Sequence, residues 1–119
     1  MIRIVNLTPH SLTVFGPDEH PLGTWPSMGV ARVMECAAPL PALETDAGPI
    51  PIASVAYADR ITELPPSTGD TAYVVSRVTA AAVTGRPDVY FPHDEVRDDQ
   101  GTIIGCRGLG RFEARIIDE

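Results

Sequence analysis

The fold is decided by residues 71–91, TAYVVSRVTAAAVTGRPDVYF. Its first five residues, Thr71 to Val75, are mostly β-branched or aromatic and predict a buried strand. Ser76 is then a good N-cap for a short helix from Arg77 to Ala82. Val89 to Phe91 has β character again, so the stretch predicts a strand, a helix and a second strand in succession.

Short strands are expected on both sides of this unit. Ile2 to Val5 and Leu12 to Phe15 are β-prone and bracket a short polar segment, which is typical of a hairpin. Val30 to Cys36 and Ile52 to Leu64 predict two further strands, the second of them long and bent.

Between these last two strands lies Ala37 to Pro51, a segment with four prolines. Proline has no N–H to donate, so we expect a long surface loop here instead of a strand or a helix. Loops of this length often act as lids or as arms that reach a partner subunit, and a plain connector is an equally good interpretation.

The C-terminal part predicts a hairpin. Val96 to Thr102 places two acids and a glycine between β-prone flanks, as turns do. In the strand expected from Thr102 to Ile117, alternation puts apolar side chains on one face and arginines, including Arg107 and Arg111, on the other. The patterns together predict an α+β fold: one domain over residues 1–119, a mainly antiparallel sheet of short strands, and one or two short helices.

Composition narrows the classes of function. The chain has 119 residues, 44% of them hydrophobic and 21% charged, and a formal net charge of −7. A negative protein is repelled by the phosphates of long nucleic acids, so such partners are not expected. No apolar run approaches the length of a membrane span, and the first residues do not resemble a secretion signal. We therefore expect a cytoplasmic protein without membrane contact.

No metal or other cofactor is expected. Cys36 and Cys106 lie far apart and the three histidines are scattered, so no metal-binding spacing is present. We expect both cysteines to be reduced and buried. The chain also lacks a recognised nucleophile motif, which disfavours an enzyme.

Anion binding has a better physical basis. The predicted helix begins with Ser76 and Arg77, and a helix N-terminus offers free N–H groups and the positive end of its dipole to a phosphate. Two arginines with forked donors and two aromatic rings that could stack on a base complete the candidate set: Arg107, Arg111, Tyr90 and Phe91. An ordinary role stays open for each of them, as a helix cap, a surface ion pair or a core side chain.

Six segments resemble small phage and prophage proteins and cover nearly the whole chain in order. They are Ile4-Val5-Asn6-Leu7-Thr8-Pro9-His10, Val30-Ala31-Arg32-Val33, Leu64-Pro65-Pro66, Ala72-Tyr73-Val74-Val75-Ser76, Val96-Arg97-Asp98-Asp99-Gln100-Gly101 and Ile104-Gly105-Cys106-Arg107. The chain resembles the first family of Thoeris anti-defence proteins, which are sponges for cyclic ADP-ribose signals made by TIR-domain enzymes of the bacterial host.

That resemblance implies a non-enzymatic binder in the cytoplasm of an infected bacterium. It would be a homo-oligomer of dimers, up to a hexamer, that holds a small cyclic nucleotide intact, and some members of the family also bind cyclic trinucleotides. By position, the arginine role falls on Arg107 or Arg111, the aromatic role on Tyr90 or Phe91, and the polar role on His93 or Asp94, where an amide would be expected.

Two other functions stay open. One is an enzyme that cleaves a cyclic nucleotide, with His93 or Ser76 taking part. The other is a phage structural or assembly protein, for which short strands and an acidic surface are adequate.

Overall fold

The structure is a computed structural model that describes residues 1–113, apart from the side chains of residues 58–60. The strands are β1 (Arg3–Asn6), β2 (Leu12–Phe15), β3 (Pro21–Trp25), β4 (Arg32–Thr45), β5 (Gly48–Thr62), β6 (Thr71–Val74), β7 (Val89–Arg97) and β8 (Ile103–Gly110), and the helix is α1 (Arg77–Ala81). The predicted C-terminal strand is thus found as far as Gly110, and its last predicted residues, 114–117, lie outside the described part.

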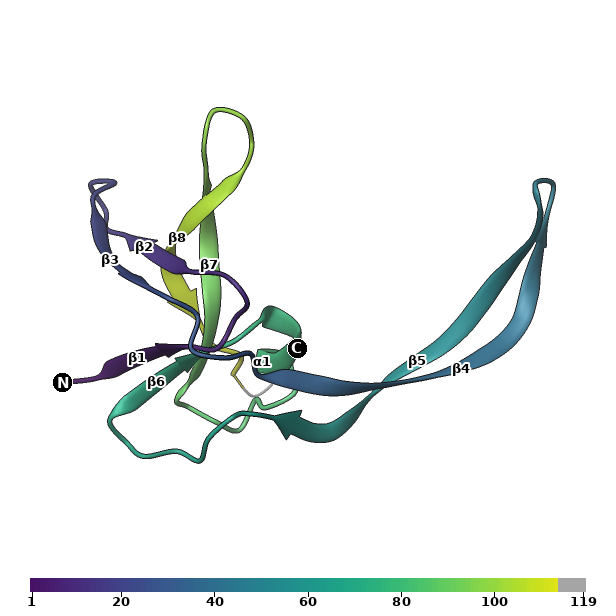
Figure 1. Cartoon of the computed structure of the whole chain (residues 1–119), viewed down its shortest axis with the longest axis horizontal. Helices are drawn as coiled ribbons and strands as arrows, with labels where there is room; N and C mark the ends of the chain where they lie inside the picture. The colour runs from purple at the N-terminus through teal and green to yellow at the C-terminus, as the bar shows by residue number, and fades with distance from the viewer. Residues whose placement is uncertain (114–119) are drawn as a thin grey trace, which may run out of the picture.

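Six of these strands form one sheet in the order β1-β6-β7-β8-β2-β3, which we call the body together with α1 (Figure 1). Its pairings β1·β6, β6·β7 and β2·β8 are parallel, whereas β7·β8 and β2·β3 are antiparallel. The expectation of a mainly antiparallel sheet is therefore wrong, because a helical crossover and two long connections bring strands together in the same direction.

The predicted strand–helix–strand unit is confirmed. β6 and β7 are parallel neighbours joined by α1, and the Ser76 hydroxyl oxygen accepts a hydrogen bond from the Thr79 N–H as an N-cap. However, β7 is longer than the predicted stretch from Val89 to Phe91, because it continues through Pro92 to Arg97. β6 pairs with β7 only at Val89 and Tyr90, so the strand beyond has an edge without a neighbour, where a proline removes no ladder hydrogen bond.

The predicted hairpin of the first two strands is wrong. β1 pairs with β6, and β2 pairs with β3 and β8. The reason lies in Asn6, whose side chain donates to the His10 carbonyl and accepts from the Thr8 N–H. These bonds hold the intervening residues in a turn that carries the chain across the body instead of back along β1.

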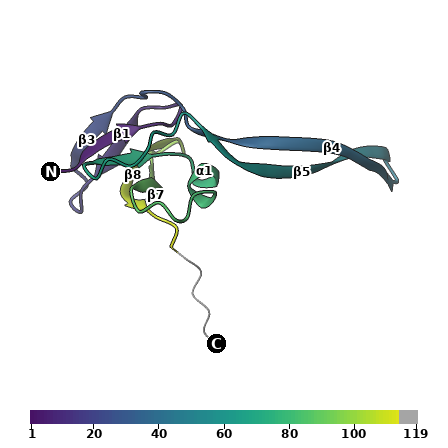
Figure 2. The same cartoon turned by 90° about the horizontal axis from the view of Figure 1, so that it is seen from below.

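The predicted loop over residues 37–51 is also wrong. β4 and β5 form a long antiparallel ribbon, and this segment supplies the distal part of both strands and the turn between them. A ribbon of two strands has two outer edges, so a proline can lie in either strand with its missing N–H facing outward. We call residues 32–62 the arm, which projects well away from the body in both views (Figures 1 and 2).

The arm makes the molecule extended. The radius of gyration is 17.9 Å and the longest dimension is 54 Å, whereas a compact domain of this length has a radius of gyration of about 13.5 Å. Nearly every arm residue from Met34 to Tyr57 is exposed.

The core lies within the body, on the two faces of the sheet. One cluster packs beneath α1 and contains Leu7, Ala31, Tyr73, Val75, Ala80, Val89 and Phe91, and the other contains Leu12, Val14, Val74 and Cys106. Cys106 is buried as expected, but Cys36 lies exposed on the arm, which corrects the prediction that both cysteines are buried.

Candidate functional site

The residues predicted to bind an anion lie on or beside three elements of the body. Ser76 and Arg77 begin α1; Tyr90, Phe91, His93 and Asp94 lie on β7; and Arg107 and Arg111 lie on β8 and just beyond it. Their contacts form three separate groups, and the described structure of the chain does not bring all eight residues around one space.

The first group surrounds the ring of Phe91. The Arg77 guanidinium carbon lies 4.5 Å from the ring centroid, and the His93 ring meets it edge-on at 6.5 Å. Phe112 stacks on Phe91 with centroids 4.7 Å apart. Phe91 is consequently 5% exposed and packs in the core, while α1, with five residues, has little dipole to offer an anion.

The second group is centred on Arg107. Its Nε and Nη2 atoms donate to the two carboxylate oxygens of Glu19 at 2.8 and 3.1 Å, and its Nη1 lies 3.5 Å from Asp94. The Arg107 guanidinium lowers the pKa of the Glu19 carboxyl below its usual range. Both acids have left-handed backbones, with φ of 66° and 63°. Arg107 therefore ties the β2–β3 turn to an irregular point of β7.

The third group contains Arg111 and Tyr90. The Arg111 Nε donates to a carboxylate oxygen of Glu113 at 2.6 Å, and its Nη1 donates to the Pro87 carbonyl at 3.1 Å. Its guanidinium carbon lies 5.9 Å from the centroid of the Tyr90 ring. Like Arg107, this arginine already has a carboxylate partner, so an anionic ligand would have to displace it.

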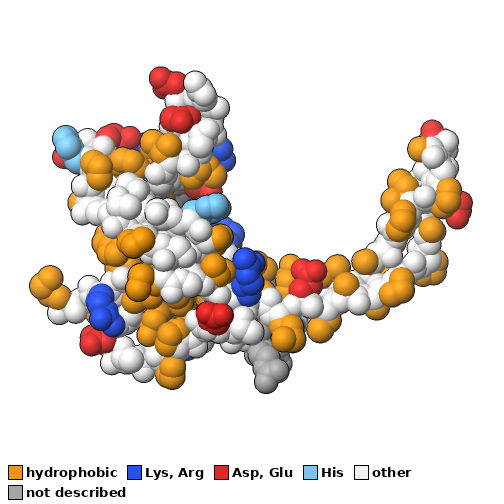
Figure 3. Space-filling view, in the orientation of Figure 1, with side chains coloured by type: hydrophobic (Ala, Val, Ile, Leu, Met, Phe, Trp, Pro, Cys, Tyr) orange, Lys and Arg blue, Asp and Glu red, His pale blue; other side chains and the backbone are white. Residues whose placement is uncertain are grey.

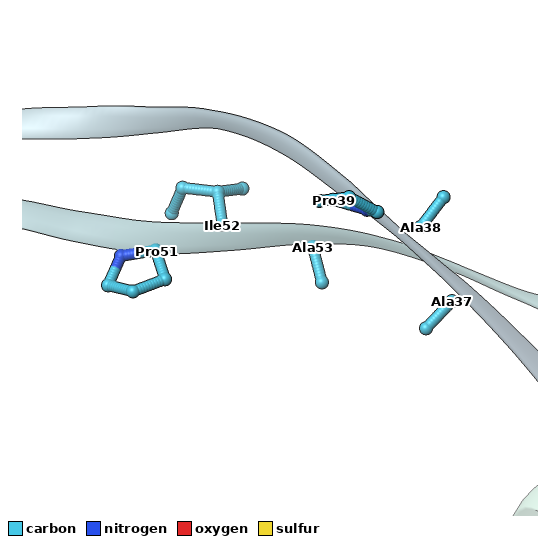
Figure 4. A pocket seen from close by; sticks show the side chains of 6 residues that line it. All are labelled: Ala37, Ala38, Pro39, Pro51, Ile52 and Ala53. Carbon is cyan, nitrogen blue, oxygen red and sulfur yellow. The ribbon is translucent and has the colours of Figure 1, made fainter.

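Two cavities of the described residues lie elsewhere. One, of about 340 Å³, is a hollow on the arm lined by small apolar side chains (Figure 4): Ala37, Ala38, Pro39, Pro51, Ile52 and Ala53. The other, of about 270 Å³, lies between β1 and the segment that follows β3, and we call it the crevice. Its lining residues are Arg3, Ile4, Val5, Asn6, Trp25, Pro26 and Met28.

The crevice exists because the sheet almost closes on itself. The Arg3 N–H bonds to the Asp70 carbonyl and the Leu7 N–H to the Val74 carbonyl, so odd-numbered residues of β1 face β6. By alternation, the backbone N–H and carbonyl groups of Ile4 and Asn6 point away from β6, toward the segment that follows β3. On this side, among the described residues, the backbone of β1 is hydrogen-bonded to that segment only at Asn6, whose carbonyl accepts from the Met28 N–H.

The arm carries a second unusual surface. Its exposed large hydrophobic side chains line the ribbon along its length (Figure 3): Met34, Leu40, Leu43, Ile50, Ile52, Val55 and Tyr57. Between residues 34 and 57 the sequence has three acids, Glu35, Glu44 and Asp46, and no lysine or arginine.

Both faces of the ribbon are apolar. Cross-strand partners share a face, and one face holds the pairs Ala37 with Val55 and Pro39 with Ala53, while the other holds Leu40 with Ile52. A two-stranded ribbon without a covered face is marginally stable in water, and a continuous exposed apolar surface marks a contact site. The arm therefore has the chemistry of a segment that is buried in an assembly.

Sequence reasoning missed both surfaces, although one signal for the arm was present. Thr45-Asp46-Ala47-Gly48 lies at the centre of the proline-bearing segment, and acid and glycine residues between apolar runs are typical of a hairpin turn. No comparable signal existed for the crevice, because its two sides come from segments that meet only in the folded body.

Comparison with known proteins gives no further guide: no protein-family model, curated protein or solved structure matches the chain. In the part of the chain that the structure describes, no helix is long and apolar enough to cross a membrane. Among the described side chains, which are those of residues 1–57 and 61–113, no three from His, Cys, Asp or Glu gather in a way that could hold a metal ion.

Proposed function

We propose that this protein is a non-catalytic assembly protein whose arm is buried against another protein subunit. The single observation that supports this proposal is the arm itself, which presents apolar side chains on both faces and no basic residue from Met34 to Tyr57. Exposing such a surface to water is unfavourable, because burying apolar surface lowers the free energy by about 25 cal/mol per Å².

The prolines indicate how the arm makes contact. At Pro39, Pro41, Pro49 and Pro51 the strands lack an N–H, so the outer edges of the arm cannot accept a continuous added strand. The arm would therefore engage its partner through its side chains, as an inserted element does, and not by extending a sheet.

Cys36 provides a native reporter for this proposal. Its thiol is exposed on the arm, whereas Cys106 is buried in the body. We would measure maleimide labelling of the folded protein in cells that naturally carry the gene and after purification from a foreign host. The Cys36→Ser variant and a denatured sample give the zero and full labelling controls.

Protection of Cys36 in both settings indicates assembly of the chain with itself, and protection only in the natural cells indicates another partner. Rapid labelling in both settings would refute the proposal. Ile50→Ser on the arm should restore labelling, while Ile103→Ser, an equally exposed change on the body, should leave Cys36 protected.

Capture of a cyclic nucleotide is the second candidate function, and Arg77 favours it. This arginine lies against the Phe91 ring beside His93, and it takes part in no ion pair among the described residues. It is thus more available to a phosphate than Arg107 or Arg111. In this reading the arm would build the homo-oligomer, and the ligand would be held between subunits.

A thermal-shift screen against cyclic ADP-ribose isomers and cyclic trinucleotides tests this second function. Ligand that is recovered unchanged after heat release would support capture, and a linearised product would instead support a cleaving enzyme. Arg77→Gln should abolish a genuine shift, whereas Arg97→Gln, which lies at the far end of β7, should not. Absence of any shift in the assembled protein would remove this candidate.

A further inference from the structure

We propose that the crevice of one copy receives the arm tip of a second copy. The arm tip is defined as residues 43–50, where Leu43 pairs with Ile50 and Glu44 with Pro49 around the turn. This inference rests on the proposed function, because it names the partner that covers the arm.

Size and polarity fit a side chain better than a small ligand. The crevice measures about 270 Å³, slightly below the range of about 300–1,000 Å³ for typical small-molecule sites. Its walls are formed mainly by Ile4, Val5, Trp25 and Met28. Leu43 and Ile50 are 54% and 45% exposed and adjacent at the arm tip, so they form a compact apolar knob for this space.

The charges of the crevice and of the arm tip are also complementary. Arg3 lines the crevice, and Glu44 and Asp46 lie beside the apolar knob at the arm tip. Packing two arms against each other would bring acids together, with no basic residue between Met34 and Tyr57 to balance them. Docking into the crevice instead places them near a guanidinium, and electrostatic complementarity of this kind selects one partner surface over another.

The geometry requires a second copy. β1 and the N-terminus lie on one side of the body, and the arm leaves the opposite side and extends away from it in both views (Figures 1 and 2). An arm therefore cannot fold back into its own crevice. A contact between two different surfaces is head-to-tail, and repetition of it gives a closed ring or an open filament.

The test uses one variant for each side of the contact. Ile50→Asp removes the knob and Met28→Asp places a carboxylate in the crevice, and both side chains are exposed in the single chain, so each variant should keep its fold, as circular dichroism and thermal melting would verify. Molar mass would be measured by light scattering for each variant and for an equimolar mixture.

We expect the wild-type protein to assemble, each variant alone to be monomeric, and the mixture to form dimers of twice the monomer mass. The dimer forms because the intact tip of the Met28→Asp copy can enter the intact crevice of the Ile50→Asp copy. Ile103→Asp, with a 48% exposed side chain on the body, should assemble like the wild type.

Two results would overturn the inference: assembly of either variant alone at wild-type affinity, or a mixture that remains monomeric. A second measurement is independent of affinity. In a Cys36→Ser background, Ile50→Cys combined with Met28→Cys should give disulfide-linked multimers on oxidation, and absence of these would also contradict the contact. If wild-type protein is monomeric at every concentration but Cys36 is protected in natural cells, this inference fails while the proposed function stands.

Discussion

Replacement of Asn6 by alanine should destabilise the body, because this side chain forms four hydrogen bonds, which we call the clasp, that join the end of β1 to the turn after it and to the end of β3. Asn6 is completely buried. Its Nδ2 donates to the His10 and Trp25 carbonyls at 2.7 and 3.0 Å, and its Oδ1 accepts from the N–H and hydroxyl of Thr8 at 3.0 and 2.6 Å.

The magnitude follows from these four bonds. Each contributes about 1 kcal/mol net, and loss of the Asn6 donor to the Trp25 carbonyl adds to the cost, whereas the His10 carbonyl keeps the Thr8 hydroxyl within reach. Asn6→Ala should therefore lower the free energy of unfolding by about 3–4 kcal/mol, which is a large share of the stability of a small domain. At about 4 °C per kcal/mol for this chain length, the melting temperature should fall by about 12–16 °C.

Urea unfolding followed by circular dichroism measures this change directly, at a protein concentration held constant between variants. His10→Ala is the matched control, because His10 contributes only its backbone carbonyl to the clasp and has an exposed side chain; its stability should stay close to that of the wild type. A loss below about 1 kcal/mol for Asn6→Ala would refute the clasp and, with it, the account of why β1 and β2 do not form a hairpin.

Two further changes probe the body. In Gly105→Ala, the new Cβ would lie 2.5 Å from the Thr13 carbonyl oxygen, so β2 and β8 must separate, and the free energy of unfolding should fall by about 1–3 kcal/mol. Gly108→Ala is the control, because its Cβ would meet nothing within 4 Å, and its stability should stay close to that of the wild type. Equal losses in the two variants would contradict this packing. Asp88 receives two hydrogen bonds from the Arg86 guanidinium at 2.9 and 2.8 Å, which lower the pKa of its carboxyl. Since the folded pKa of Asp88 lies below the unfolded value of about 3.9, this pair stabilises the fold above about pH 4, and the contribution is lost as the pH falls through the folded pKa. Asp88→Asn should thus be less stable than the wild type at pH 7, and the difference in stability should shrink as the pH is lowered through the folded pKa. A difference that does not change with pH would rule out the ion pair as its cause.

The local elements could be read from the sequence because each depends on a few consecutive residues. The cap at Ser76, the helix after it and the turn at residues 98–102 are all found where they were expected. In each case the deciding interaction, such as the bond between the Ser76 hydroxyl and the Thr79 N–H, joins residues two to four positions apart.

The candidate site was less predictable, because a charged side chain has several partners within reach. Sequence alternation places Arg107 and Arg111 on one face of a strand, but it does not say which acids meet them. Glu19, which binds Arg107, is 88 residues away in the chain. Only the folded body shows that both arginines are already paired and that neither lines the crevice or the hollow on the arm.

The sequence by itself determined the strand–helix–strand unit, the acidic charge and the apolar character of residues 37–51. Only the tertiary structure decided that these residues form an arm and that β1 pairs with β6 and leaves a crevice on its other side. The physical reason is that a proline in a strand is tolerated or forbidden according to whether a neighbour needs its N–H, and strand partners are chosen by long-range packing. Neither the neighbour of a proline nor the partner of a strand can be read from a few consecutive residues.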